Sequence, residues 1–118
     1  MTQIFRTRLT EMYEVPLPIV VGGMMWMSRA EFVAACARAG AMSFMTAKSY
    51  ADPDDFRKGL EHCIELADGH PFGVNFSISR FRPNDIVEAG VEIALDRGVR
   101  HFETAGSHPG ALIDRIHA

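Results

Sequence analysis

Four apolar segments, each ending at its carboxyl side in small or polar residues, constrain the fold of this chain more than any other feature. They span residues 18–22, 41–46, 71–76 and 99–104, and none alternates apolar with polar residues. Continuous apolar strands are typical of parallel sheets buried on both faces. Helical patterns lie between these segments. The order therefore predicts an α/β fold in which helices connect parallel strands.

The three intervening helices have recognisable ends, and each ends at a glycine. The first is expected to begin at Ser28, with Ser28 and Glu31 as a capping box, and the others span residues 52–69 and 83–98. A fourth begins near residue 111. The apolar positions expected to face the sheet are Phe32, Val33, Cys36 and Ala37, then Phe56, Leu60, Ile64 and Ala67, then Ile86, Val87, Gly90, Val91, Ala94 and Leu95.

Length, charge and cysteine content narrow the class of protein. The 118 residues, 47% hydrophobic and 23% charged, suit one globular domain. A net charge of -3 with scattered Lys and Arg argues against nucleic acid and anionic membranes as partners. Residues 17–21 are too short to cross a bilayer and residues 1–10 lack a secretory core, which predicts a cytoplasmic protein. Cys36 and Cys63 are expected to be reduced, buried thiols, and no metal-ligand spacing is present.

The ends of the first and third predicted strands carry the main candidate residues. Gly22 and Gly23 let the backbone approach a ligand closely, or else form a plain tight turn. The run Met24 to Met27, which includes Trp26, suits a flat aromatic ligand, with core filling as the alternative. Asn75 is an amide within an apolar strand, and its partner is either a ligand or a neighbouring loop backbone.

The fourth strand adds weaker candidates. Thr104, Ala105 and Gly106 repeat the small-residue ending, and Glu103 either pairs with an Arg or serves the pocket. His108 is a candidate general base, with helix capping as the alternative. His62, His70 and His117 are expected to face solvent.

Four segments taken together resemble one family. Residues 18–26 (PIVVGGMMW), 29–41 (RAEFVAACARAGA), 71–75 (PFGVN) and 103–106 (ETAG) are similar, in order and spacing, to nitronate monooxygenases, formerly called 2-nitropropane dioxygenases. The similarity runs from about Leu9 to the last residue. It implies an FMN-binding TIM barrel that oxidises alkyl nitronates with O2. Relatives with similar first strands include FMN-dependent enoyl-acyl-carrier-protein reductases.

The resemblance also implies which residues meet the cofactor. Gly22, Gly23 and Met24 would lie against the isoalloxazine ring, and Asn75 would hydrogen-bond to the flavin. Many members carry a Gln beside the first glycines, where this sequence has Val21 and Gly22. The family's catalytic His and phosphate-binding glycines lie beyond the fourth strand, so the resemblance assigns no catalytic residue here.

A TIM barrel needs about 200 to 250 residues or more, so residues 1–118 are expected to form a single incomplete barrel domain of about three and a half βα units. We expect this amino-terminal portion to be inactive or nearly so alone, and its open sheet edges favour self-association. Two other functions stay open. One is an FMN-dependent enoyl-thioester reductase, and the other is a non-enzymatic half-barrel interaction module.

Overall fold

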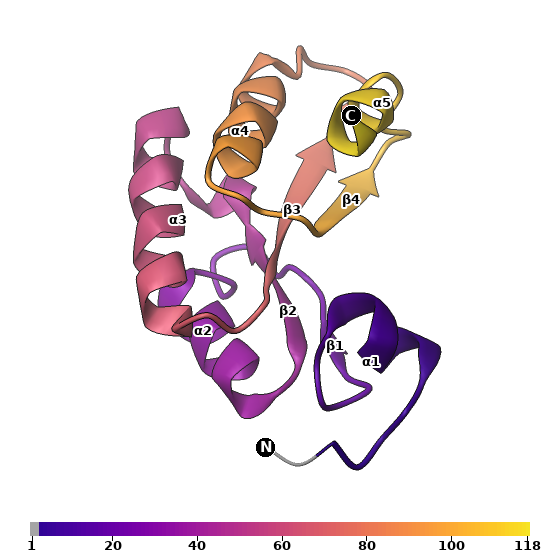
Figure 1. Cartoon of the computed structure of the whole chain (residues 1–118). Coiled ribbons are helices and arrows are strands. Elements are labelled where there is room, and N and C mark those ends of the chain that lie inside the picture. The colour runs from indigo at the N-terminus through magenta and orange to yellow at the C-terminus, as the bar shows by residue number, and fades with distance from the viewer. Residues whose placement is uncertain (1–2) are drawn as a thin grey trace.

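A sheet of four parallel strands forms the centre of the computed structural model, which describes residues 3–118. The strands lie side by side in chain order: β1 (Val20–Val21), β2 (Met42–Thr46), β3 (Gly73–Ile78) and β4 (Phe102–Gly106). They are connected by α2 (Ala30–Ala39), α3 (Pro53–Ala67) and α4 (Asp85–Asp96). Figure 1 shows these helices along one side of the sheet, here called the outer face. Sequential parallel strands with helices outside form the first half of a (β/α)8 barrel, which confirms the predicted fold class.

Three shorter helices complete the fold. A 3-10 turn, η1 (Ala47–Ser49), follows β2, and α5 (Leu112–His117) follows β4, as predicted for the start of a fourth helix. The helix α1 (Arg8–Tyr13) was not predicted. Thr7 and Thr10 form its capping box, in which each threonine hydroxyl accepts a hydrogen bond from the other residue's backbone N–H. In Figure 1, α1 lies beside β1 on the side away from α3 and α4.

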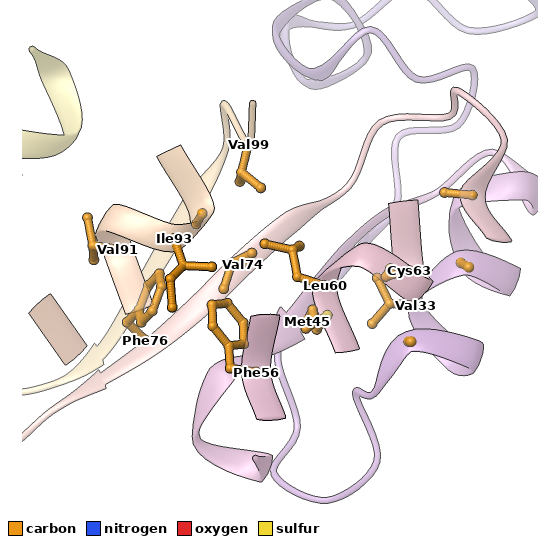
Figure 2. Packing of buried hydrophobic residues seen from close by; sticks show 14 of the residues in the cluster. Val33, Met45, Phe56, Leu60, Cys63, Val74, Phe76, Val91, Ile93 and Val99 are labelled. Atoms are coloured by element: carbon orange, nitrogen blue, oxygen red, sulfur yellow. The ribbon is translucent and has the colours of Figure 1, made fainter. Parts of the chain in front are cut away.

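The outer face of the sheet carries the main hydrophobic core. Figure 2 shows Phe56 and Leu60 of α3 close to Val74 and Phe76 of β3. The Phe76 ring packs edge-on to Phe56, with centroids 6.1 Å apart, and stacks on Phe102 at 6.2 Å. Removing these side chains from water supplies the largest stabilising contribution in a domain of this size.

The opposite, inner face has a smaller apolar cluster at its amino-terminal end. Val15, Met42 and Phe44 are buried there, and Tyr13 of α1 packs against them. The Tyr13 ring lies edge-on to Phe44 at 6.1 Å and to His101 at 5.1 Å. The unpredicted helix α1 therefore covers this end of the inner face.

The prediction that all four strands are buried on both faces is wrong for the two outermost strands. The central strands β2 and β3 are almost wholly buried, whereas Val20 of β1 is 43% exposed and the last two residues of β4 are exposed. The cause is position, because in the described residues β1 pairs with β2 alone and β4 with β3 alone. The observed strands also begin two or three residues later than predicted in β1, β3 and β4.

Helix starts were predicted correctly only in part. Asp52 caps α3 as expected, since its carboxylate accepts from the Asp55 N–H at 2.8 Å. Ser28 is not a cap. The helix α2 begins at Ala30 behind an Arg29 N-cap that makes no side-chain bond, and Ser28 Oγ instead accepts from the Met24 N–H at 2.8 Å. The third helix begins at Asp85, two residues after the predicted Pro83.

Three residues assigned to the core from helical spacing are exposed instead. Phe32, Ile64 and Ile86 are 36%, 39% and 68% exposed. On α3 the buried stripe runs through Phe56, Leu60, Cys63 and Ala67, which places Ile64 at its margin. Spacing alone did not distinguish the centre of the stripe from its edge.

The two cysteines are free thiols, as predicted, although Cys36 is only half-buried. Burial raises the pKa of the Cys63 thiol to about 12, so this group stays protonated and unreactive at neutral pH. Along residues 3–118, no helix combines the length and hydropathy that a transmembrane segment needs.

Candidate functional site

One side chain or backbone group from each of the four βα units meets on the inner face, toward the carboxyl end of the sheet. Thr46 pairs in register with Asn75, and Asn75 pairs with Glu103. Gly23, two residues past β1, lies on top of this line, because a Cβ there would stand 2.5 Å from Asn75 Cβ and 2.7 Å from Thr46 Oγ1. We call Gly23, Thr46, Asn75 and Glu103 the inner-face row.

Glu103 ties this row together. Its Oε1 accepts a hydrogen bond from Asn75 Nδ2 at 2.6 Å and another from the Gly23 backbone N–H at 3.0 Å. The sequence left its partner open between an Arg and the pocket. Within residues 3–118, no Arg forms a salt bridge with Glu103, and the carboxylate instead connects the β1 turn to β3 and β4.

Asn75 is buried at 4% exposure, but it stands in the middle of β3 and not at its carboxyl end as predicted. It is still level with Thr46, the last residue of β2, because β3 and β4 extend further along the sheet. The predicted alternative partner, a loop backbone, is not what the amide nitrogen contacts. It donates to the neighbouring strand's carboxylate.

Thr46 Oγ1 is a buried hydroxyl oxygen without a hydrogen-bond partner among the described residues, and its residue is 2% exposed. Leaving such a group unpaired costs about 1–3 kcal/mol. Ser43 Oγ on the same strand is likewise buried without a partner among the described residues, and Thr46 Oγ1 lies directly under the Gly23 backbone.

The turn after β1 is held by hydroxyls. The Met24 N–H donates to Ser28 Oγ at 2.8 Å, and the Trp26 N–H donates to Ser49 Oγ at 2.7 Å. Ser28 in turn accepts the Thr46 N–H at its carbonyl oxygen, 3.0 Å away. The Gly23 and Met24 amides are therefore already bonded within the chain, so a ligand would meet the flat face of these peptides and not free N–H groups.

The apolar side chains of this turn do not fill the core. Met24, Met25, Trp26 and Met27 are 39%, 45%, 67% and 60% exposed, which rules out the core-filling alternative. Trp26 also adopts a left-handed φ of 73°, uncommon for a bulky residue, and its N–H bond to Ser49 fixes it there. An ordered turn with exposed apolar side chains is a suitable wall for an apolar or aromatic ligand.

The histidines lie away from the row. His108 is exposed, and its Nδ1 accepts from the Gly110 N–H at 2.9 Å in the turn before α5. The capping alternative is wrong, because α5 has Ala111 as its N-cap and no side-chain cap. His101 lies at the amino-terminal end of the inner face, where burial and the Arg100 charge lower its pKa. His62, His70 and His117 are exposed, as predicted. Among the described residues, no three His, Cys, Asp or Glu side chains are grouped to hold a metal ion.

Two cavities lie elsewhere on the molecule. One of about 820 Å³ lies between the ends of β3 and β4 and the helices α4 and α5, where Arg80, His108 and Arg115 line it. The other, of about 270 Å³, lies between α3 and α4 and is lined by Tyr50, Phe76 and Val87 among others. Neither cavity is lined by a residue of the inner-face row.

Comparison with known families matches nearly the whole chain. The family model described as nitronate monooxygenase matches residues 6–107. A protein of Mycobacterium tuberculosis, (3aS,4S,5R,7aS)-5-hydroxy-7a-methyl-1-oxo-octahydro-1H-indene-4-carboxyl-CoA dehydrogenase, is 32% identical over 113 residues, a match that covers 94% of this chain and 30% of that protein.

Solved structures give the same result for the fold. FabK from Thermotoga maritima superposes with a TM-score of 0.82 at 27% identity, covering 96% of this chain and 34% of FabK. Nitroalkane oxidase from Streptomyces ansochromogenes gives a TM-score of 0.74 at 22% identity, covering 95% of this chain and 41% of the oxidase. At that identity the oxidase is evidence for the fold alone. The chain spans about a third of the length of these proteins.

Proposed function

The chain belongs to the nitronate monooxygenase family, and we propose that it forms the flavin-ring side of an FMN-dependent oxidoreductase that oxidises alkyl nitronates with molecular oxygen. The observation that carries this proposal is the inner-face row, where a glycine backbone and a buried amide are both bonded to Glu103 on the inner face of the sheet. Barrel enzymes bind their ligands at this carboxyl-terminal side.

The residues of the row fit the flat ring of a flavin. Gly23 has no side chain, which lets its backbone pack directly on Asn75 and Thr46, and a planar group would lie against the other face of residues Gly22 to Met24. Asn75 would supply an amide for hydrogen bonds to the ring, and Glu103 holds that amide in place. Bound flavin would supply the electron transfer that no side chain of this chain provides.

A second candidate is an oxidoreductase of acyl thioesters. The relative at 32% identity is named a carboxyl-CoA dehydrogenase, and an enoyl reductase domain of MlnA from Bacillus amyloliquefaciens shares the fold with a TM-score of 0.72 at 17% identity, covering 84% of this chain and 23% of that one. We propose the same flavin site for both candidates, which differ in the substrate and in the second reactant, O2 for the nitronate and NADH for the enoyl thioester.

We further propose that residues 3–118 form one incomplete barrel domain, with the catalytic base and the phosphate site on strands after β4. The lengths of the matched proteins support this. The exposed edges of β1 and β4 favour self-association of the isolated chain, and its two free thiols suit a cytoplasmic location.

The test uses the product of the gene that encodes these residues. FMN titration by fluorescence quenching is expected to show saturable binding. Oxygen consumption with an alkyl nitronate and NADH oxidation with an enoyl-CoA then separate the two substrate classes. Nitronate-dependent oxygen uptake supports the first candidate, and enoyl-dependent NADH oxidation without it supports the second. A product that binds no FMN and sediments as a defined dimer would overturn both and favour the non-enzymatic module.

A further inference from the structure

Glu103 is a carboxylate within an apolar strand whose environment the proposed function does not yet explain. Its Oε1 is the shared acceptor for two donors from different parts of the barrel, Asn75 Nδ2 at 2.6 Å and Gly23 N–H at 3.0 Å. Hydrogen bonds to an ionised acceptor are shorter and stronger than neutral ones. Both donors belong to the residues proposed to meet the flavin ring.

The chemistry of this contact fixes the orientation of the Asn75 amide. Glu103 Oε1 accepts from both the Gly23 N–H and the Asn75 amide, so the amide turns its NH2 group toward Glu103. The other end of the amide, Oδ1, can only accept. The oxidised flavin ring carries one N–H, at N3, whereas its other polar ring atoms are acceptors. Asn75 held in this orientation therefore matches N3–H.

We propose, on the basis of the proposed flavin site, that Glu103 is its positioning residue. The carboxylate orients Asn75 so that Oδ1 can accept a hydrogen bond from an imide-type N–H of the ligand. It also holds the Gly22 to Met24 turn in place against β3 and β4. Glu103 acts through these two residues and takes no part in electron transfer.

The structure offers a matched control for this role. Glu61 is also a carboxylate that accepts two hydrogen bonds, from the Arg97 guanidinium at 3.1 and 2.9 Å, but it lies on the surface between α3 and α4. Glu61→Ala removes a doubly bonded carboxylate without touching the inner-face row. Any effect specific to Glu103 is absent from this variant.

The experiment compares FMN with N3-methyl-FMN, which lacks the N3 proton, as probes of the gene product. Wild type is expected to bind N3-methyl-FMN about tenfold more weakly than FMN, as loss of one buried hydrogen bond predicts. Glu103→Ala should lower the affinity for FMN by about tenfold. It should lower the affinity for N3-methyl-FMN far less, because that flavin already lacks the hydrogen bond from N3–H to Asn75. Glu103→Gln, which keeps a carbonyl acceptor, should restore most of the FMN affinity, and Glu61→Ala should match wild type.

Equal affinity of wild type for the two flavins, or an unchanged preference in Glu103→Ala, overturns the inference. If Glu103→Ala does not fold, Glu103→Asp replaces it, because the shorter side chain keeps a carboxylate but moves its oxygens away from Asn75 and Gly23. Unchanged FMN affinity in Glu103→Asp overturns the positioning role of Glu103. Amide hydrogen exchange at Gly23 reports on the Glu103–Gly23 hydrogen bond without any flavin. A gene product that binds neither flavin overturns the proposed function and the role of Asn75 toward the ligand. Exchange at Gly23 that is no faster in Glu103→Ala overturns the inference that Glu103 holds this turn.

Discussion

The two faces of the sheet are built from alternate residues of the same strands, yet they bury different chemistry. On β3, Val74, Phe76 and Ile78 face the helices and form the apolar core, whereas Asn75 between them faces inward and bonds to Glu103. The outer face is closed by three helices, and the inner face is closed by α1 at one end only. Because side chains alternate along a strand, neighbouring residues of β3 serve different purposes: one set forms the core, and the residue between them belongs to the candidate site.

The largest expected effect tests the outer face. Phe76→Ala removes a ring that packs on Phe56, Phe102 and Gly90, and should lower the free energy of unfolding by about 3–5 kcal/mol or leave the chain unfolded. Asn75→Ala, one residue away, should cost much less, because it removes a hydrogen bond and no packed ring. Urea denaturation of both variants measures the difference. Equal losses would contradict the division of the two faces.

The next effect tests the inner face with two adjacent glycines. Neither has a left-handed φ, so alanine is allowed by the backbone at both. At Gly23 the new Cβ would collide with Asn75 and Thr46, whereas at Gly22 it would stand 3.4 Å from the flexible end of Glu103. Gly23→Ala should destabilise by about 1–3 kcal/mol through overpacking and abolish FMN binding.

Gly22→Ala is the matched control for stability alone and should leave the free energy of unfolding nearly unchanged, because its Cβ meets only the flexible end of Glu103. Denaturation of the pair separates the two positions, and FMN titration follows binding in Gly23→Ala. Retained FMN binding in Gly23→Ala would show that the ring does not lie against this turn.

The sequence was sufficient to predict the parallel half-barrel, because continuous apolar segments and glycine-terminated helices are local signals. It also brought forward Gly23 and Asn75, which the structure places in contact. The sequence could not predict that Glu103 bonds to both residues. The partner of such a carboxylate depends on the register between two strands, which neither strand determines by itself.

Other misses have equally specific causes. Ser28 is a residue type that often caps helices, but its hydroxyl instead accepts a hydrogen bond from the Met24 N–H of the preceding turn. The exposure of β1 depends on how many neighbours a strand has, which its own residues do not encode. The helix α1 is only six residues long, below the length at which helical periodicity is readable.

A smaller effect is expected at the opposite end of the inner face. Tyr13→Leu removes two edge-on aromatic contacts, to Phe44 and His101, and should cost about 1 kcal/mol of stability. FMN affinity should not change, because this cluster lies at the other end of the strands from the row. Tyr13→Phe keeps both ring contacts and serves as the control. Weaker FMN binding in Tyr13→Leu alone would show that the two ends are coupled.

The smallest effect is a pH dependence that arises at the same amino-terminal end. Burial beside Tyr13 lowers the pKa of His101, the Arg100 charge lowers it further, and Glu14 partly opposes this. In the unfolded chain a histidine titrates near its ordinary pKa of about 6.5. Between the two pKa values the unfolded state binds more protons, so stability is present above about pH 6.5 and is lost as the pH falls toward the folded pKa.

His101→Phe keeps an aromatic ring against Tyr13 and removes the titration. The stability of this variant between about pH 7.5 and pH 5.5 should therefore fall less than that of wild type. Urea denaturation at the two pH values measures the change. The same loss of stability in His101→Phe as in wild type would show that His101 does not cause the pH dependence.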